Sequence, residues 1–313
     1  MQDTTFTLMN REGTPLFVYR WLPDKETPFR GIVQIAHGMC ETALRYEEAA
    51  AYLTRHGYIV YANDHLGHGR TASGPDMLGN PGPDAFNRMA EDMAELGAWI
   101  RKEQPALPII LMGHSMGSFL TQKLMYDKPE LYSGFILSGT NGKRSLLKMG
   151  ERLAVMQSMM RGENHRSMLL NALVFGGFNR SFRPARTPFD WLSRDQEEVD
   201  LFINDPLCGA ICTAGFFRDF FKLLQDIQVP SSLLRIPKDK PVYLFSGEQD
   251  PVGLHGKGVL SLADQYRELG IHEVTYKLYP EGRHEMLHEV NREEVFRDLV
   301  KWLDTHTPAV AEV

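Results

Sequence analysis

The amino-acid sequence predicts an α/β fold with a mostly parallel central sheet, helices on both faces and a helical insertion. Short apolar runs alternate with segments of helical periodicity, which is the pattern of successive βαβ units. This alternation stops near residue 143 and resumes near residue 241. The 313-residue chain is 43% apolar and 24% charged, close to an average globular protein, and is long enough to bury a large core.

The chain opens with a predicted hairpin. Residues 5–9 alternate in polarity, residues 10–13 (Asn-Arg-Glu-Gly) have turn chemistry, and residues 16–21 are rich in β-forming side chains. The apolar run over 31–36 then predicts a strand that is buried on both faces. A helix is expected over 47–56, because helical spacing there stops at Gly57.

The later elements follow the same reasoning. The segment 84–102 places four apolar residues on one side of a helix, namely Met89, Met93, Leu96 and Ile100. Short apolar runs predict further strands at 58–62, 108–112, 134–138, 241–245 and 273–278. Helical periodicity predicts helices at 118–126, 260–269 and 292–304.

The interruption divides the chain into two parts. We expect a core domain formed by residues 1–142 and 228–313, and a helical cap formed by residues 143–227. The cap segment is rich in Met, Phe and Leu. A helical insertion between sheet strands falls over the carboxyl edge of the sheet, so part of its apolar surface should line a site there.

A candidate nucleophile lies after the strand at 108–112. Residues 113–117 (Gly-His-Ser-Met-Gly) match G-x-S-x-G and are followed directly by a predicted helix. This strand–turn–helix setting is the one that a nucleophile elbow requires, with Ser115 at the sharp turn. The alternative is a glycine-rich turn with an idle serine. Ser115 also argues against epoxide hydrolases and dehalogenases, which place an aspartate at the elbow.

A serine hydroxyl needs a base, and in this fold the order is nucleophile, acid, histidine. Asp250 and His284 each follow a predicted strand, where parallel sheets place their sites. Asp250 would orient and stabilise the imidazole of His284. The alternative for Asp250 is a helix N-cap. His288 is the rival base, and we expect it on the following helix, away from the strand end.

An oxyanion hole needs two backbone N–H groups. Met116, the residue after the nucleophile, should provide one. Met39, in the loop after the first parallel strand, should provide the other, because Gly38 lets this loop turn close to the substrate. His37, just before that glycine, is expected to brace the loop rather than to act as a base.

Two other groups of polar residues permit a metal site but do not favour one. Asp64, His65 and His68 lie in a glycine-rich loop, which they are expected to brace. Cys208 and Cys212 are four positions apart without a second pair, so ordinary packing is expected for both. The sequence therefore predicts catalysis without a metal.

Charge and terminal sequence limit the function further. The formal net charge of −6 argues against nucleic acid as a partner. The N-terminus lacks a secretory pattern, and no segment is long and apolar enough to span a membrane. The three cysteines, Cys40, Cys208 and Cys212, fit a reducing compartment, so a cytoplasmic location is expected.

Several motifs together resemble the monoacylglycerol lipase and lysophospholipase branch of the α/β hydrolases. They run in matching order from about residue 30 to 290, so the resemblance covers most of the chain. The segments are 36–39 with Arg45-Tyr46, 63–69, 113–117, 193–207, 250–253 and 283–285. The resemblance implies the α/β-hydrolase fold, ester hydrolysis without a cofactor and a helical cap. It also implies Ser115, Asp250 and His284 as triad, with Met39 and Met116 as oxyanion donors.

The predicted function is therefore a serine hydrolase that cleaves carboxylic esters through an acyl-enzyme, with monoacylglycerols or lysophospholipids as substrates. Leu170 and Phe178, from the apolar cap, are expected to line the acyl pocket. The cap's composition is also compatible with transient contact with a membrane surface. The alternatives are a serine aminopeptidase or amidase with the same triad, and a non-catalytic ligand receptor on a hydrolase scaffold.

Overall fold

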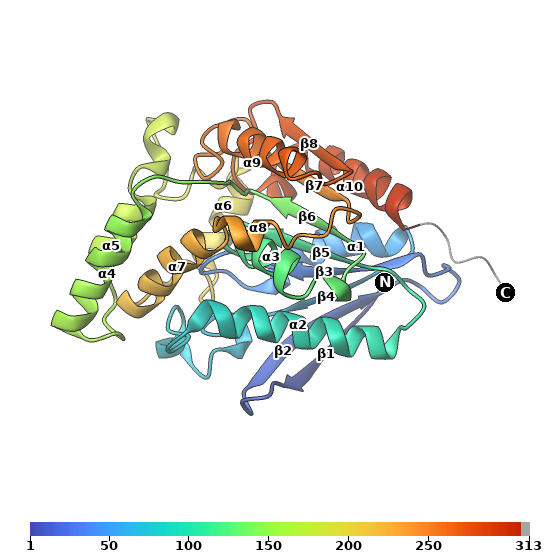
Figure 1. Ribbon diagram of the computed structural model, residues 1–313, viewed down its shortest axis with the longest axis horizontal. Coiled ribbons are helices and arrows are strands. Elements are labelled where there is room, and N and C mark those ends of the chain that lie inside the picture. The colour runs from blue at the N-terminus through green and yellow to red at the C-terminus, as the bar shows by residue number, and fades with distance from the viewer. Residues whose placement is uncertain (308–313) are drawn as a thin grey trace.

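The computed structural model describes residues 1–307 and is built around one eight-stranded sheet (Figure 1). The strand order is β1-β2-β4-β3-β5-β6-β7-β8. β2 pairs antiparallel with both β1 and β4, and every other neighbouring pair is parallel. The strands are β1 (Gln2–Met9), β2 (Pro15–Leu22), β3 (Gly31–Ala36), β4 (Tyr58–Asn63), β5 (Ile109–His114), β6 (Gly134–Ser138), β7 (Val242–Gly247) and β8 (Val274–Tyr279).

Helices cover both faces of this sheet, and each face has its own apolar cluster. On one face, buried residues of the sheet pack with α2 (Ala85–Glu103), α3 (Met116–Asp127) and α9 (Lys257–Glu268). On the other face they pack with α1 (Glu47–Arg55) and α10 (Arg292–His306). The continuous apolar runs of β3 to β7 are explained by this burial on both sides.

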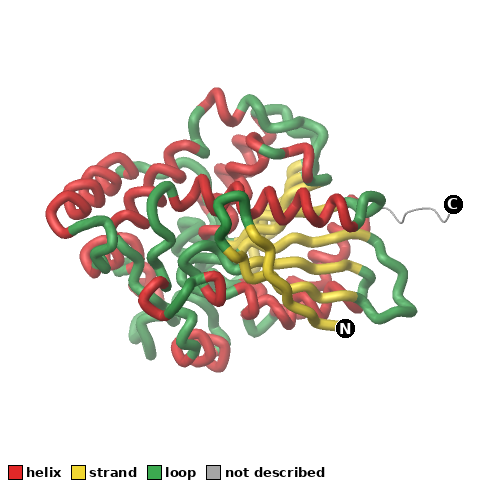
Figure 2. The backbone as a smooth tube through the Cα atoms, turned by 90° about the horizontal axis from the view of Figure 1, so that it is seen from below, coloured by secondary structure: helices red, strands yellow, loops and turns green. Residues whose placement is uncertain are grey.

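Helical segments fill the chain between β6 and β7, and they lie to the left of the sheet in Figure 1. Figure 2 shows the same arrangement from below, with the strands on one side and these helices on the other. They are α4 (Leu147–Arg161), α5 (Met168–Phe175), η5 (Phe178–Phe182), α6 (Gln196–Asn204), α7 (Ala214–Asp226) and α8 (Pro230–Leu233). We refer to residues 143–227 as the cap. The predicted division into core and cap stays a prediction, and residues 308–313 of the core segment lie outside the described residues.

Short 3₁₀ helices occur in the loops around the sheet. They are η1 (Ala43–Tyr46), η2 (Gly69–Thr71), η3 (Pro75–Met77), η4 (Pro129–Leu131) and η6 (Met286–His288). Within residues 1–307, no helix has the length and apolar character needed to cross a bilayer.

The predicted fold class is confirmed, including the N-terminal hairpin and the parallel strands that follow it. The register brings the carboxyl ends of three neighbouring strands together. Ala36 at the end of β3 lies opposite Gly113 of β5, and His114 of β5 lies opposite Ser138 of β6. The loops after β3, β5 and β6 therefore meet at one edge of the sheet.

Candidate active site

Ser115 lies at the turn between β5 and α3, in a backbone conformation that side chains rarely adopt. Its φ is 50° and its ψ is −118°. Two glycines make this turn sterically allowed. A Cβ on Gly117 would lie 2.1 Å from the carbonyl oxygen of Ala36, and one on Gly113 would lie 2.3 Å from the carbonyl oxygen of Gly117. The strained serine and the small flanking residues form the arrangement expected of a nucleophile elbow.

His284 and Asp250 form a buried pair near this turn. The Nδ1 atom of His284 lies 3.0 Å from Oδ1 of Asp250, and the two side chains are 2% and 0% exposed. The hydroxyl of Ser246 donates to Oδ2 of Asp250 at 2.6 Å. The carboxylate thus fixes the ring with Nδ1–H as the donor, which leaves Nε2 as the basic nitrogen.

The electrostatics of the pair favour a charged state. Burial alone would raise the pKa of Asp250, but the attraction of His284 and three hydrogen bonds outweigh it and lower that pKa. Burial would likewise lower the pKa of His284, but the Asp250 carboxylate outweighs it and raises that pKa. An imidazolium formed at His284 during a reaction would therefore be stabilised.

The His284 ring is enclosed by two aromatic rings. The ring centroids of Trp191 and His114 lie 5.0 Å and 4.7 Å from that of His284. Burial lowers the pKa of His114 to about 4, so this neighbouring ring stays neutral at physiological pH. A Cβ on Gly139, after β6, would lie 2.8 Å from Cε1 of His284. Position 139 must therefore be a glycine for the ring to lie where it does.

The loop after β3 approaches the elbow closely. A Cβ on Gly38 would lie 3.3 Å from Cβ of Ser115. Within residues 1–307, the backbone N–H groups of Met39 and Met116 donate to no protein acceptor. Both N–H groups are therefore unpaired within the described residues, as the donors of an oxyanion hole have to be.

Two cavities meet at Ser115, which lines both together with Met39 and Phe175. The first has a volume of about 450 Å³, and His284 and Trp191 also line it. The second has a volume of about 270 Å³ and does not include His284. Its walls are mostly apolar and include Phe119, Phe220, Phe221, Leu173 and Met116. We call them the histidine-side cavity and the apolar cavity.

The two cap residues expected in the acyl pocket differ in position. Phe178 lines the apolar cavity, as expected. Leu170 lines neither cavity, which corrects the expectation for this residue. It is fully buried in the large apolar cluster, because it lies on the side of α5 that packs onto the protein. Its neighbours Asn171 and Leu173 line the cavities instead.

A buried ionic cluster borders the histidine-side cavity and was not predicted. The guanidinium of Arg45 forms two hydrogen bonds of 2.7 Å with Glu285 and one of 2.5 Å with Glu41. The other oxygen of Glu41 accepts the N–H of Gly38 and the hydroxyl of Tyr46. Burial would raise the pKa of each carboxyl group, but the charge of Arg45 outweighs it and lowers both. The cluster connects the loop after β3 to the residue after His284.

Arg45 and the histidine loop also contact the cap. The guanidinium of Arg45 lies 5.0 Å from the ring centroid of Phe202 in α6. The N–H of Glu285 donates to the carbonyl of Leu192 at 2.8 Å, and the guanidinium of Arg283 donates to the carbonyl of Ser193 at 3.0 Å. The cap is thus fixed directly against the loop that carries His284.

His37 and Asp64 brace the loops as expected. Nε2 of His37 accepts the N–H of His65 at 2.9 Å, and its Nδ1 lies 2.8 Å from the carbonyl of Gly38. Burial lowers the pKa of His37 to about 4, which favours the neutral ring. Oxygens of Asp64 accept from the side chains of Thr42 and Tyr19 and from the backbone of Ala43 and Arg70. Among the described residues, no group of three or more His, Cys, Asp or Glu side chains is placed to hold a metal ion.

His288 differs from the expectation. It lies on η6 rather than on α10, and it is only 6% exposed. Its Nε2 lies 2.9 Å from the carbonyl of Arg45, so it supports the loop of the ionic cluster. Cys208 and Cys212 are free thiols, and Sγ of Cys212 lies 3.1 Å from Sγ of Cys40 in the buried interior.

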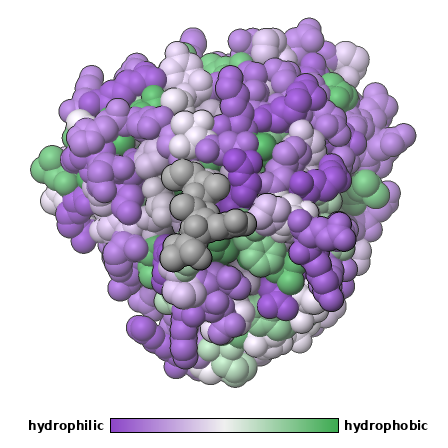
Figure 3. Space-filling view, turned by 90° about the vertical axis from the view of Figure 1, so that its right-hand side faces the viewer, coloured by the Kyte–Doolittle hydropathy of each residue, from purple (hydrophilic) through white to green (hydrophobic). Residues whose placement is uncertain are grey.

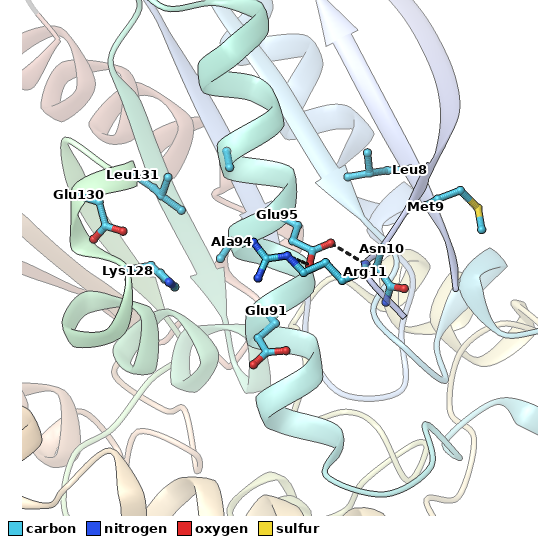
Figure 4. Close-up of a pocket in the computed structure, with 11 residues that line it drawn as sticks. Leu8, Met9, Asn10, Arg11, Glu91, Ala94, Glu95, Lys128, Glu130 and Leu131 are labelled. Atoms are coloured by element: carbon cyan, nitrogen blue, oxygen red, sulfur yellow. Dashed lines mark hydrogen bonds and ion pairs between the residues drawn. The ribbon is translucent and has the colours of Figure 1, made fainter. Parts of the chain in front are cut away.

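Another cavity, of about 480 Å³, lies between the β1–β2 turn and α2 (Figure 4). Arg11 and Glu95, drawn there as an ion pair, are separated by 3.2 Å. None of the predicted catalytic residues lines this cavity.

Comparisons with known proteins find similar sequences and structures over most of the chain. The family model described as serine aminopeptidase, S33, matches residues 27–291. The monoglyceride lipase of Rattus norvegicus is 29% identical over 91% of this chain and 88% of its own length. The monoacylglycerol lipase of Mycolicibacterium smegmatis is 28% identical over 91% of each chain. A highly thermostable carboxyl esterase from Bacillus coagulans, solved in complex with glycerol, superposes with a TM-score of 0.90 at 27% identity, covering 98% of this chain and 99% of its own.

Proposed function

From the premise that this chain belongs to the serine aminopeptidase S33 family of α/β hydrolases and is a carboxylic ester hydrolase, we propose that it cleaves monoacylglycerols at Ser115. The observation that carries the proposal is the buried Asp250–His284 pair beside a serine in a strained turn. Two relatives named as monoacylglycerol or monoglyceride lipases support the substrate.

In the proposed reaction, Nε2 of His284 accepts the proton of the Ser115 hydroxyl as the serine attacks the ester carbonyl. The N–H groups of Met39 and Met116 stabilise the oxyanion of the tetrahedral intermediate. His284 then donates the proton to the alcohol oxygen, the C–O bond breaks and an acyl-enzyme remains. Water, activated by His284, hydrolyses the acyl-enzyme and releases the carboxylic acid.

This sequence of steps indicates which cavity receives the alcohol and which receives the acyl chain. The leaving alcohol must lie within reach of His284, because that residue protonates it. The histidine-side cavity, which His284 lines, therefore receives the alcohol, and the apolar cavity receives the acyl chain. Glycerol as the alcohol is supported by the similar esterase that was solved with glycerol.

Amide hydrolysis is less well supported, although the family description names an aminopeptidase. An aminopeptidase needs a carboxylate that binds the substrate's amino group. Glu41 and Glu285 both line the histidine-side cavity. However, Arg45 already pairs with both carboxylates, and Gly38 and Tyr46 occupy the remaining oxygen of Glu41. These carboxylates are therefore committed to the protein rather than to a substrate amine.

Transient contact of the cap with a lipid surface is part of the proposal. Large apolar side chains are exposed on α4 and α5, including Met156, Met159, Met160, Met168 and Leu169. The opposite end of the molecule is mostly hydrophilic (Figure 3). An apolar surface beside the acyl cavity would place its mouth against lipid. A cytoplasmic location is likewise kept as a prediction, from the cysteine usage of the sequence.

The test compares hydrolysis of monoacylglycerols, lysophospholipids, p-nitrophenyl esters and aminoacyl p-nitroanilides. The parent enzyme should prefer monoacylglycerols. The Ser115→Ala variant should lose activity by several orders of magnitude while keeping the parent's circular dichroism spectrum. Activity within tenfold of the parent would show that Ser115 is not the nucleophile, and preference for the anilides would replace the esterase assignment with an aminopeptidase.

A further inference from the structure

Arg144 is the only charged side chain among the described residues that line the apolar cavity. It lies in the loop between β6 and α4, and the cavity that it lines also contains Ser115, Met39 and Met116. Arg144 is partly buried. The part of the cation that has lost water among Met, Phe and Leu side chains is unfavourable unless a partner compensates for that loss.

The protein supplies little compensation. Within residues 1–307, the guanidinium of Arg144 forms no ion pair, and its one hydrogen bond is donated to the carbonyl of Val252 at 3.2 Å. That bond uses one of the five N–H groups of the side chain. The same carbonyl already accepts a shorter bond of 2.7 Å from Asn141.

The carboxylate that acts electrostatically on Arg144 is that of Asp250, and it binds other groups. Burial lowers the pKa of Arg144, and the charge of Asp250 opposes this effect. The two oxygens of Asp250, however, bind His284, Ser246 and the N–H of Val252. Arg144 thus remains a cation with unused donors, facing a cavity that the substrate must fill.

We infer that Arg144 makes the apolar cavity a binding site for acyl groups that carry an anionic group, such as a carboxylate, away from the ester. The inference rests on the proposed function, since it takes the apolar cavity as the acyl side. The guanidinium would bind the carboxylate with charge-assisted hydrogen bonds, while the surrounding Phe and Leu side chains contact the methylenes between the two groups. Esters of dicarboxylic acids have this chemistry.

The experiment uses p-nitrophenyl monoesters of adipic, suberic and azelaic acids. Shorter hemiesters are avoided because their free carboxylate attacks the ester directly. Each is compared with the neutral p-nitrophenyl alkanoate of equal carbon number, and with its own methyl-capped diester. The measured quantity is the selectivity ratio, which is kcat/KM for the anionic ester divided by kcat/KM for the neutral ester. Each variant is its own reference, so a general loss of activity does not affect the ratio.

The parent should show its highest ratio at one chain length, at which the carboxylate reaches Arg144. At that length, Arg144→Gln should lower the ratio by about tenfold or more, since a charge-assisted hydrogen bond in a partly buried site is lost. Lys143→Gln is the matched control, because it removes the same charge from the adjacent, exposed position that does not line the cavity. Its ratio should stay at the parent value.

A second measurement needs no variant. In the parent, added salt should lower kcat/KM for the anionic ester and leave it unchanged for the neutral one. If the selectivity ratios of the parent, Arg144→Gln and Lys143→Gln are equal while neutral esters are still hydrolysed, the inference about Arg144 is overturned and the proposed function is not affected. Absence of any Ser115-dependent ester hydrolysis would instead refute the proposed function. An Arg144-dependent preference for monoacylglycerol phosphate over monoacylglycerol would place the anion on the alcohol and overturn the cavity assignment.

Discussion

Replacing Arg45 by methionine should destabilise the protein more than replacing its acidic partner Glu285 by glutamine. The cluster holds two carboxylates and one guanidinium, with side-chain exposures of 2% for Glu41, 5% for Glu285 and 9% for Arg45. Arg45→Met leaves two buried carboxylates without a cation. Removing the partner of a buried charge in this way costs about 3–5 kcal/mol of unfolding free energy.

Glu285→Gln instead leaves Glu41 and Arg45 as a neutral pair, so the loss is limited to charge-assisted hydrogen bonds, about 1–3 kcal/mol. Urea unfolding of both variants, followed by circular dichroism, measures the two values. The pH dependence provides a second criterion. In the parent, the pKa of Glu285 is lowered, so its contribution is lost only in acid, as the pH falls through that lowered pKa.

In Arg45→Met the sign reverses. Two buried carboxylates without a cation have raised pKa values, so the folded state binds more protons than the unfolded state near neutral pH. Stability of this variant should therefore fall as the pH rises from about 5 to 8, while that of the parent should not show this loss from the cluster. Equal destabilisation by Arg45→Met and Glu285→Gln, at a pH-independent value, would refute the electrostatic account of the cluster.

Three further predictions concern the base, the acyl cavity and a remote carboxyl group. His284→Ala should reduce kcat about as much as Ser115→Ala does. His288→Ala should reduce kcat only mildly while lowering the unfolding free energy by about 1–3 kcal/mol, and the reverse ranking in kcat would identify His288 as the base. For the parent, kcat/KM should rise from p-nitrophenyl acetate to octanoate by up to ~0.8 kcal/mol per methylene; Phe178→Ser should flatten that rise, and a parent fastest on acetate would refute the acyl assignment. Burial raises the pKa of Asp92 to about 7, so the folded state holds a proton that the unfolded state releases. The unfolding free energy should therefore fall as the pH rises toward 7. This pH dependence should be absent in Asp92→Asn, and its persistence in that variant would exclude Asp92 as the cause.

The sequence predicted the fold and the triad constellation because local signals carry both. Apolar runs of strand length define β3 to β7, and the catalytic motifs follow directly after strands. Parallel strands bring their carboxyl ends to one edge, so Asp250 and His284 could be paired although 34 positions separate them. The roles of Ser115, Asp250, His284, Met39 and Met116 in catalysis remain proposals that the variants above test.

The ionic cluster had no comparable signal. Arg45 and Glu285 are 240 positions apart, and charged residues in a sequence are by default assigned to the surface. The cap posed a different difficulty. Leu170 and Leu173 are chemically alike and lie on one helix, yet only Leu173 lines the cavity. Apolar residues surround α5 so evenly that periodicity does not distinguish the side facing the substrate from the side packed on the core.

The difference between the predictable catalytic residues and the unpredictable cavity lining reflects how each part of the site is built. Three glycines, one after each of β3, β5 and β6, let backbone and side chains approach closely. A Cβ on Gly38 would lie 3.3 Å from Cβ of Ser115, whereas one on Gly117 or Gly139 would clash with Ala36 or His284 at 2.1 Å or 2.8 Å. The proposed reacting groups are thus positioned where main-chain segments approach closely at the sheet edge. This close approach requires glycine at fixed positions, and the sequence motifs contain those glycines. The apolar cavity is instead lined by core residues such as Phe119 together with cap side chains such as Leu173, and the orientation of the cap side chains depends on tertiary packing. The catalytic constellation could therefore be proposed from the sequence, as could Phe178 at the apolar cavity, whereas the position of Arg144 in that cavity needed the structure.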